Sequence, residues 1–160
     1  MRTRSVRSVV YLGAGLGLIV AIFAAAEFLD PGLTSVCSFN GFFSCGKVAQ
    51  SGLTTTVGIP DWAWGVAGFI VILAVAALAE KRPGDSRLAY LLLAVTTVGV
   101  ALSFYLLYVE LVQINALCVV CASAYLLGGV AWVGAIALVR RPSGDAGDDD
   151  QGTDRSDDDP

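Results

Sequence analysis

Residues 62–79 read WAWGVAGFIVILAVAALA and contain no charged side chain. Three other stretches are almost as apolar, namely residues 8–29, 88–109 and 111–139. A helix that crosses a bilayer core needs about 20 consecutive, mostly apolar residues. The last stretch exceeds that length, so we place its helix at about residues 117–139 and residues 111–116 at the membrane interface. The sequence therefore predicts an all-α membrane protein, a bundle of four transmembrane helices.

The overall composition agrees with a membrane protein. Hydrophobic residues make up 56% of the chain before its 18 glycines are counted, whereas soluble domains reach only about 45–50% with glycine included. The chain has no histidine, which excludes histidine-based acid–base catalysis and histidine ligands to a metal or haem. Its chemistry must therefore come from four cysteines, hydroxyl groups or carboxylates.

Lysine and arginine lie almost entirely on one side of the predicted bundle. Nine of the ten basic residues precede the first apolar stretch, join the second to the third, or follow the fourth: Arg2, Arg4, Arg7, Lys81, Arg82, Arg87, Arg140, Arg141 and Arg155. Only Lys47 lies in the loop of residues 30–61. Because cytoplasmic loops carry the excess of basic residues, we expect both termini in the cytoplasm. The 30–61 loop, between the first two helices, and the 110–117 link then face outward from the cell membrane.

Each end of the chain requires a further interpretation. The basic residues before the first stretch and Ala24-Ala25-Ala26 resemble a cleavable signal peptide, but the apolar run exceeds the usual ~7–15 residues, so we expect a retained helix. Residues 141–160 hold eight of the 14 acidic residues and are rich in glycine and serine. Such a composition cannot form a packed core. We therefore predict a membrane domain over residues 1–140 and a disordered acidic cytoplasmic tail over residues 141–160.

The four cysteines fall at the outward-facing end of this topology. Cys37 and Cys45 lie in the outer loop, and Cys118 and Cys121 form a Cys-x-x-Cys at the start of the last helix. A helix start stabilises a thiolate, which is the species that attacks disulfides. Helical spacing also places Tyr125 on the same face, roughly 10 Å deeper, where its phenol can bond a carbonyl oxygen of a lipid-soluble ligand.

Three interpretations of the cysteines are open: two structural disulfides, a zinc site with four cysteine ligands, or redox-active pairs. Four cysteines allow three disulfide connectivities. The zinc site is disfavoured because the ligand spacing is loose and the site adjoins lipid. We favour redox-active pairs, since two outward pairs in a four-helix chain are a stronger signal than one Cys-x-x-Cys.

Several short motifs together resemble the vitamin K epoxide reductase family and its prokaryotic homologues over roughly residues 8–140. The motifs are Cys37-Ser38, Cys45, Ser51, Gly58-Ile59-Pro60, and Cys118-Val119-Val120-Cys121 followed by Tyr125. The resemblance implies a four-helix bundle around a quinone with the loop cysteines above it. By position, it implies that Cys37 exchanges with a thioredoxin-like partner and that Cys45 passes electrons to Cys118. Cys121 would then lie nearest the quinone ring.

The resemblance also implies a quinone site. Ser51 and Tyr125 match residues beside the quinone, which would be of the menaquinone or ubiquinone type. The asparagine that vertebrate enzymes place near the quinone has no clear counterpart, which argues against epoxide reduction. Trp62 and Trp64 open the second helix; we interpret them as interfacial anchors, with capping of the quinone pocket as the alternative.

The function that this resemblance implies is a membrane thiol–disulfide oxidoreductase that supports disulfide formation outside the cytoplasm. Because the chain ends soon after the fourth helix, we expect the thioredoxin-like thiol oxidase to be a separate protein, and the other partners to be lipid and the quinone pool, without nucleic acid. One alternative is a quinone or quinone-epoxide reductase that uses thiols only as its electron source. Another is a non-enzymatic scaffold with structural disulfides. The unrelated bacterial four-helix disulfide oxidases are disfavoured, because they place Cys-x-x-Cys in the first outer loop.

Overall fold

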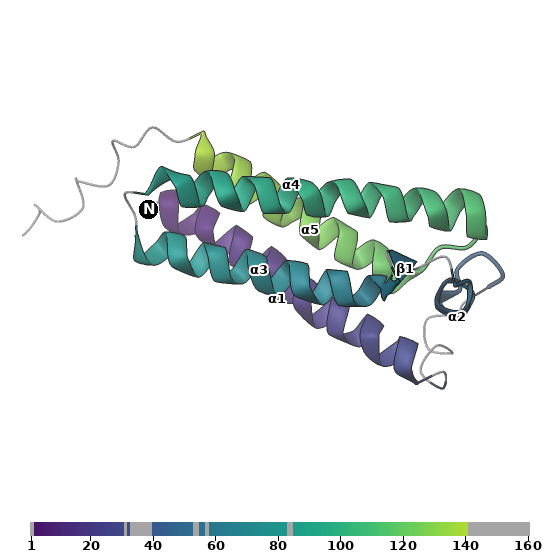
Figure 1. Ribbon diagram of the computed structural model, residues 1–160. Coiled ribbons are helices and arrows are strands. Elements are labelled where there is room, and N and C mark those ends of the chain that lie inside the picture. The colour runs from purple at the N-terminus through teal and green to yellow at the C-terminus, as the bar shows by residue number, and fades with distance from the viewer. Residues whose placement is uncertain are drawn as a thin grey trace, which may run out of the picture.

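The computed structural model describes residues 2–30, 32, 40–52, 55–56, 58–82 and 85–140 of the protein (Figure 1). Its four long helices are α1 (Arg2–Leu29), α3 (Asp61–Lys81), α4 (Ser86–Tyr108) and α5 (Val119–Val139). Each is long and apolar enough to cross a membrane, so the predicted four-helix transmembrane bundle is confirmed. Cys37 and the predicted tail of residues 141–160 lie outside the described residues.

The four helices pack lengthwise into one bundle (Figure 1). Helix α1 contacts α5 and α3, and α4 contacts α5 and α3. At Gly13 of α1, a Cβ atom would lie 3.1 Å from both the Ala131 nitrogen and the Leu127 oxygen of α5, and a Cβ atom at Gly134 of α5 would lie 2.6 Å from Cγ2 of Val10. Small residues allow this close approach of helices in lipid.

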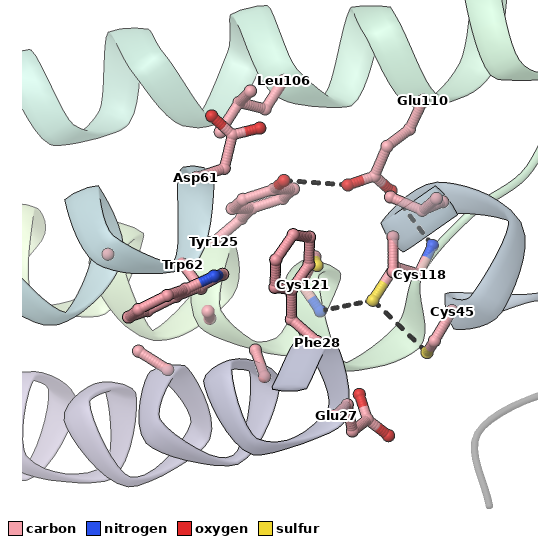
Figure 2. A pocket seen from close by; sticks show the side chains of 16 residues that line it. Glu27, Phe28, Cys45, Asp61, Trp62, Leu106, Glu110, Cys118, Cys121 and Tyr125 are labelled. Carbon is pink, nitrogen blue, oxygen red and sulfur yellow. Dashed lines mark hydrogen bonds between the residues drawn. The ribbon is translucent and has the colours of Figure 1, made fainter. Parts of the chain in front are cut away.

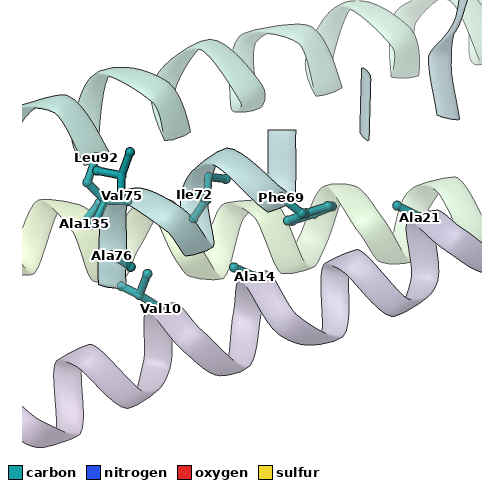
Figure 3. Packing of buried hydrophobic residues seen from close by; sticks show 9 residues of the cluster. All are labelled: Val10, Ala14, Ala21, Phe69, Ile72, Val75, Ala76, Leu92 and Ala135. Atoms are coloured by element: carbon teal, nitrogen blue, oxygen red, sulfur yellow. The ribbon is translucent and has the colours of Figure 1, made fainter. Parts of the chain in front are cut away.

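A buried apolar core joins the helices along the bundle axis (Figure 3). It consists of Val10, Ala14, Ala21, Phe69, Ile72, Val75, Ala76, Leu92 and Ala135. Large apolar side chains also cover the outside of the bundle; Leu126 is 74% exposed and Phe104 69% exposed. Helices that are apolar on all sides fit a lipid environment, in agreement with the composition.

A compact cap closes the end of the bundle where α2 and β1 lie (Figure 1). It comprises α2 (Cys45–Gln50) and an antiparallel pair of short strands, β1 (Thr55–Thr56) and β2 (Ile59–Pro60). The Ser44 side chain accepts a hydrogen bond from the Lys47 N–H and so caps the start of α2, a common role for serine. The strand pair leads directly into the first turn of α3.

The cap is attached to the segment before α5 by backbone hydrogen bonds. The Leu117 N–H donates to the Phe42 oxygen at 2.8 Å, and the Ser44 N–H donates to the Leu117 oxygen at 3.2 Å. Because Ser44 precedes Cys45 and Leu117 precedes Cys118, these bonds bring the two cysteines together across the chain.

The end of the third transmembrane helix differs from the prediction. We expected the helix to stop at Val109 and residues 110–117 to form a link, but α4 continues as a π-helix, η2 (Val109–Ile114). The helix ends at Asn115, which has a left-handed φ of 53°. The physical reason is that the Glu110 side chain is only 2% exposed and finds hydrogen-bond partners within the bundle, so it need not mark the membrane surface. Wider π-turns inside helices commonly occur at functional sites.

Candidate functional site

Three of the four cysteines meet where the cap contacts α5 (Figure 2). The Cys118 thiol points at Cys45, with 3.3 Å between the two sulfur atoms. Cys45 and Cys118 are both buried. Cys45 is disulfide-bonded, whereas Cys118 and Cys121 carry free thiols. The structure therefore brings together Cys45, Cys118 and Cys121 as the sequence predicts, and Cys37 lies outside the described residues.

Cys118 is the N-cap of α5, and the cap geometry favours its thiolate. Its sulfur accepts a hydrogen bond from the Cys121 backbone N–H at 3.3 Å. Hydrogen bonds from the Cys121 thiol and backbone lower the pKa of the Cys118 thiol below its usual value, although burial and the nearby Glu110 and Glu27 carboxylates act in the opposite direction. Of the two free thiols, Cys118 is thus the one stabilised as a thiolate, the form in which a cysteine enters or leaves a disulfide.

Glu110 connects this thiol to the interior of the bundle (Figure 2). Its Oε2 accepts a hydrogen bond from the Cys118 backbone N–H at 3.0 Å, and its Oε1 accepts one from the Tyr125 hydroxyl at 2.9 Å. Two accepted hydrogen bonds suit an ionised carboxylate, which has no proton to donate. Glu110 therefore fixes both the start of α5 and the ring of Tyr125.

Glu110 is the residue of this site that the sequence did not reveal. Its signal was present, because it is the only charged residue between positions 88 and 139. Intramembrane acidic residues are rare and commonly functional. We instead interpreted this residue as the break between two apolar stretches.

A cavity of about 110 Å³ lies within the bundle, directly beside Cys45, Cys118 and Cys121. Its walls come from α1, α2, α3, α4, η2 and α5: Ala21, Ala24, Glu27, Phe28, Cys45, Val48, Ala49, Asp61, Trp62, Gly65, Leu106, Glu110, Cys118, Cys121, Ala124 and Tyr125. The predicted shared face of Cys118, Cys121 and Tyr125 is thus confirmed. Ser51 is not among these lining residues; it ends α2, and its hydroxyl donates to the Val48 oxygen at 2.8 Å.

Two polar atoms of the cavity wall have no hydrogen-bond partner among the residues that the structure describes. They are Oε1 of Glu27 and Nε1 of Trp62, and both are buried. The Trp62 ring packs against Phe28 of α1, with 6.3 Å between the ring centroids. The sequence favours an interfacial anchor for Trp62, with capping of a pocket as the alternative, and the structure places Trp62 in the cavity wall.

A model of the vitamin K epoxide reductase family matches residues 8–136. The chain belongs to this family. The matched range includes the four cysteines and Tyr125, so the resemblance drawn from the short motifs is confirmed. As a member of the vitamin K epoxide reductase family, the protein is a multi-pass membrane oxidoreductase of the quinone and thiol type.

The cavity has the properties needed for the quinones on which the vitamin K epoxide reductase family acts. A quinone ring is flat and apolar and carries two carbonyl oxygens that only accept hydrogen bonds. Apolar cavities of proteins bind flat rings such as benzene, and this cavity is lined mainly by apolar side chains. The lining also includes the N–H of Trp62, which has no partner among the described residues. The residues present therefore fit a quinone ring.

Proposed function

We propose that this protein relays electrons from a thioredoxin-like partner through two cysteine pairs to a quinone, and so supports disulfide formation outside the cytoplasm. The observation that carries the proposal is the position of Cys118. Its sulfur lies 3.3 Å from the sulfur of Cys45, and Cys121 is three residues further on the same helix face. Cys118 thus stands between the loop cysteine and the cysteine that lines the cavity.

The outer step takes two electrons and two protons from the partner. With Cys118 and Cys121 free, Cys37 is the remaining cysteine of the chain, and we assign it to the disulfide with Cys45. The partner's thiolate attacks Cys37 and opens that disulfide. The second partner thiol then displaces Cys37, so that the partner is oxidised and Cys37 and Cys45 become thiols.

The transfer between the pairs is a sequence of thiol–disulfide exchanges. The Cys45 thiolate attacks Cys118 of an oxidised Cys118–Cys121 pair and releases Cys121 as a thiolate. Cys37 then attacks Cys45, restores the outer disulfide and releases Cys118. Two electrons have moved inward, and the result has the redox state of the structure, with Cys45 in a disulfide and the inner pair reduced.

The inner step uses the reduced pair at the cavity. A quinone supplies the electron sink, since it takes up two electrons and two protons to become a quinol. The Cys118–Cys121 disulfide forms again as those electrons leave, and the two thiols release the two protons. Cys121 and Tyr125 border the ring, and the hydrogen bonds of Glu110 hold Cys118 and Tyr125 in place. We no longer assign Ser51 to this site.

The charge distribution supports an outward orientation of the cysteines. The N-terminus, the link between α3 and α4, and the end of α5 lie together at one end of the bundle, opposite α2 and β1 (Figure 1). Of the basic residues that the structure describes, all but Lys47 of α2 lie at the first of these ends. By the positive-inside rule, we propose that both termini are cytoplasmic and that the cysteines face the oxidising side.

Turnover by the purified protein in nanodiscs tests this proposal. The assay supplies a dithiol donor and a menaquinone or ubiquinone analogue under argon and follows quinone absorbance. We expect continuous reduction that is lost in the Cys121→Ser variant. A folded protein that reduces no quinone with any donor would instead support a scaffold with structural disulfides. The remaining alternative is a quinone or quinone-epoxide reductase that uses thiols only as its electron source. The redox state of cysteines in secreted proteins, measured in cells that lack this protein, distinguishes the two, because only the proposed relay predicts that those cysteines stay reduced.

A further inference from the structure

We propose that Trp62 is a quinone-binding residue whose indole N–H donates a hydrogen bond to a carbonyl oxygen of the bound ring. This inference rests on the proposed function, because it takes a quinone as the occupant of the cavity below Cys118. It assigns a role to a side chain that the sequence suggests is an interfacial anchor.

Among the described residues, the indole N–H of Trp62 is an unused hydrogen-bond donor. The Nε1 atom of Trp62 is buried and has no hydrogen-bond partner in the described part of the chain. Indole N–H groups usually find a partner when they are buried, so a partnerless one in a cavity wall indicates a missing acceptor. The same cavity is lined by Cys121 and Tyr125, which places that acceptor beside the reduced thiol pair.

Among the described side chains that line the cavity, only Trp62 carries an N–H group. The Tyr125 hydroxyl donates its hydrogen bond to Glu110, whose other carboxylate oxygen accepts from the Cys118 N–H. Thiols are weak donors. A quinone oxygen is an acceptor only. Of the lining side chains, Trp62 has the free N–H that complements it.

The indole of Trp62 is held in place by its own helix and by Phe28. Trp62 is the second residue of α3, directly after the strand pair β1–β2 that ends at Pro60. Its ring packs on Phe28 of α1, with the two ring planes at 46° (Figure 2). A donor fixed by its own helix and by a neighbouring one loses little freedom on binding, so its hydrogen bond contributes more fully to affinity.

The test removes the N–H and keeps an aromatic ring. In the full-length protein in nanodiscs, Trp62→Phe is expected to raise both the KM and the dissociation constant for a menaquinone analogue roughly threefold to tenfold, the range for one neutral hydrogen bond. Trp64→Phe is the matched control, because Trp64 is 42% exposed and is not among the described residues that line the cavity. It should leave both constants unchanged.

Infrared spectroscopy supplies a readout that does not depend on turnover. With a quinone labelled with ¹³C at its carbonyl groups, one C=O stretch should lie at a lower frequency in the wild-type complex and return toward the free value in Trp62→Phe. A second variant carries benzothienylalanine at position 62, where sulfur replaces N–H at almost the same shape. It should reproduce both effects without the loss of ring volume.

The outcomes separate this inference from the proposed function. If the wild type binds quinone with the shifted stretch but does not reduce it, the relay is wrong and the role of Trp62 stands. If the wild type reduces quinone and both position-62 variants keep its affinity and infrared spectrum, the relay stands and the role of Trp62 is wrong. A loss of stability in both variants with an unchanged C=O stretch would show a purely structural residue and would also overturn the inference.

Discussion

The hydrogen bond between Tyr125 and Glu110 allows a quantitative test of the site. The Tyr125 hydroxyl donates to Oε1 of Glu110 at 2.9 Å, and Glu110 is 2% exposed. Tyr125→Phe removes the donor and leaves one oxygen of a buried carboxylate without this partner. Glu110→Gln keeps an acceptor oxygen for the Cys118 N–H and turns an NH₂ group toward Tyr125, so the charged hydrogen bond to Tyr125 is replaced by a neutral one.

The expected magnitudes follow from the type of bond. A hydrogen bond to a charged group contributes about 1.5–3 kcal/mol. We therefore expect each single substitution to lower the free energy of unfolding by about 1.5–3 kcal/mol. Because both substitutions remove the same charged hydrogen bond, the combined loss in the double variant should fall short of the sum by at least ~1 kcal/mol.

The assay is a double-mutant cycle in bicelles, with unfolding followed by steric trapping or tryptophan fluorescence. Tyr125→Phe combined with Ser51→Ala is the control pair, because Ser51 ends α2 and bonds to the Val48 oxygen. That pair should be additive within about 0.5 kcal/mol. Additive losses for Glu110→Gln and Tyr125→Phe would refute the bridge that connects Cys118 to the cavity.

Three further predictions concern the thiol, the helix contact and the loop serine. Hydrogen bonds from Cys121 lower the pKa of the Cys118 thiol, so the alkylation rate of Cys118 should rise with pH at a lower midpoint than the ~8.5 of a free cysteine. The Cys121→Ala variant should shift that midpoint to higher pH. An unchanged midpoint would contradict the assigned cause. Gly13→Ala should lower the free energy of unfolding by about 1–3 kcal/mol, because its Cβ would lie 3.1 Å from two backbone atoms of α5. Gly15→Ala is the control and should cost far less, because a Cβ there would have nothing within 4 Å. Equal unfolding free energies for the two variants would argue against the α1–α5 contact. Ser51→Ala should leave the KM for quinone unchanged, and a clear increase would return Ser51 to the site.

The features that sequence could predict are those carried by local periodicity. Uncharged runs such as residues 62–79 identify the spans because a bilayer requires them. Helical spacing placed Cys118, Cys121 and Tyr125 on one face, and the structure confirms that they line one cavity.

The features that sequence missed depend on partners far along the chain. Glu110 is buried because it bonds to residues 8 and 15 positions away, and without those partners a lone acid indicates a membrane surface. Trp62 lines the cavity because Phe28 of α1 packs on its ring. Cys45 meets Cys118 through backbone bonds between Phe42 and Leu117. No short-range pattern in the sequence predicts any of these contacts.

A single-turnover experiment tests the central claim most directly. Protein in nanodiscs is reduced at Cys118 and Cys121, freed of reductant and mixed under argon with one equivalent of a menaquinone analogue. Quinol is followed by absorbance, and the thiols are followed by alkylation and mass spectrometry. The relay predicts one quinol per protein, formed at the same rate as the Cys118–Cys121 disulfide. Quinol that forms while both thiols remain free, or a disulfide that forms without quinol, would contradict it.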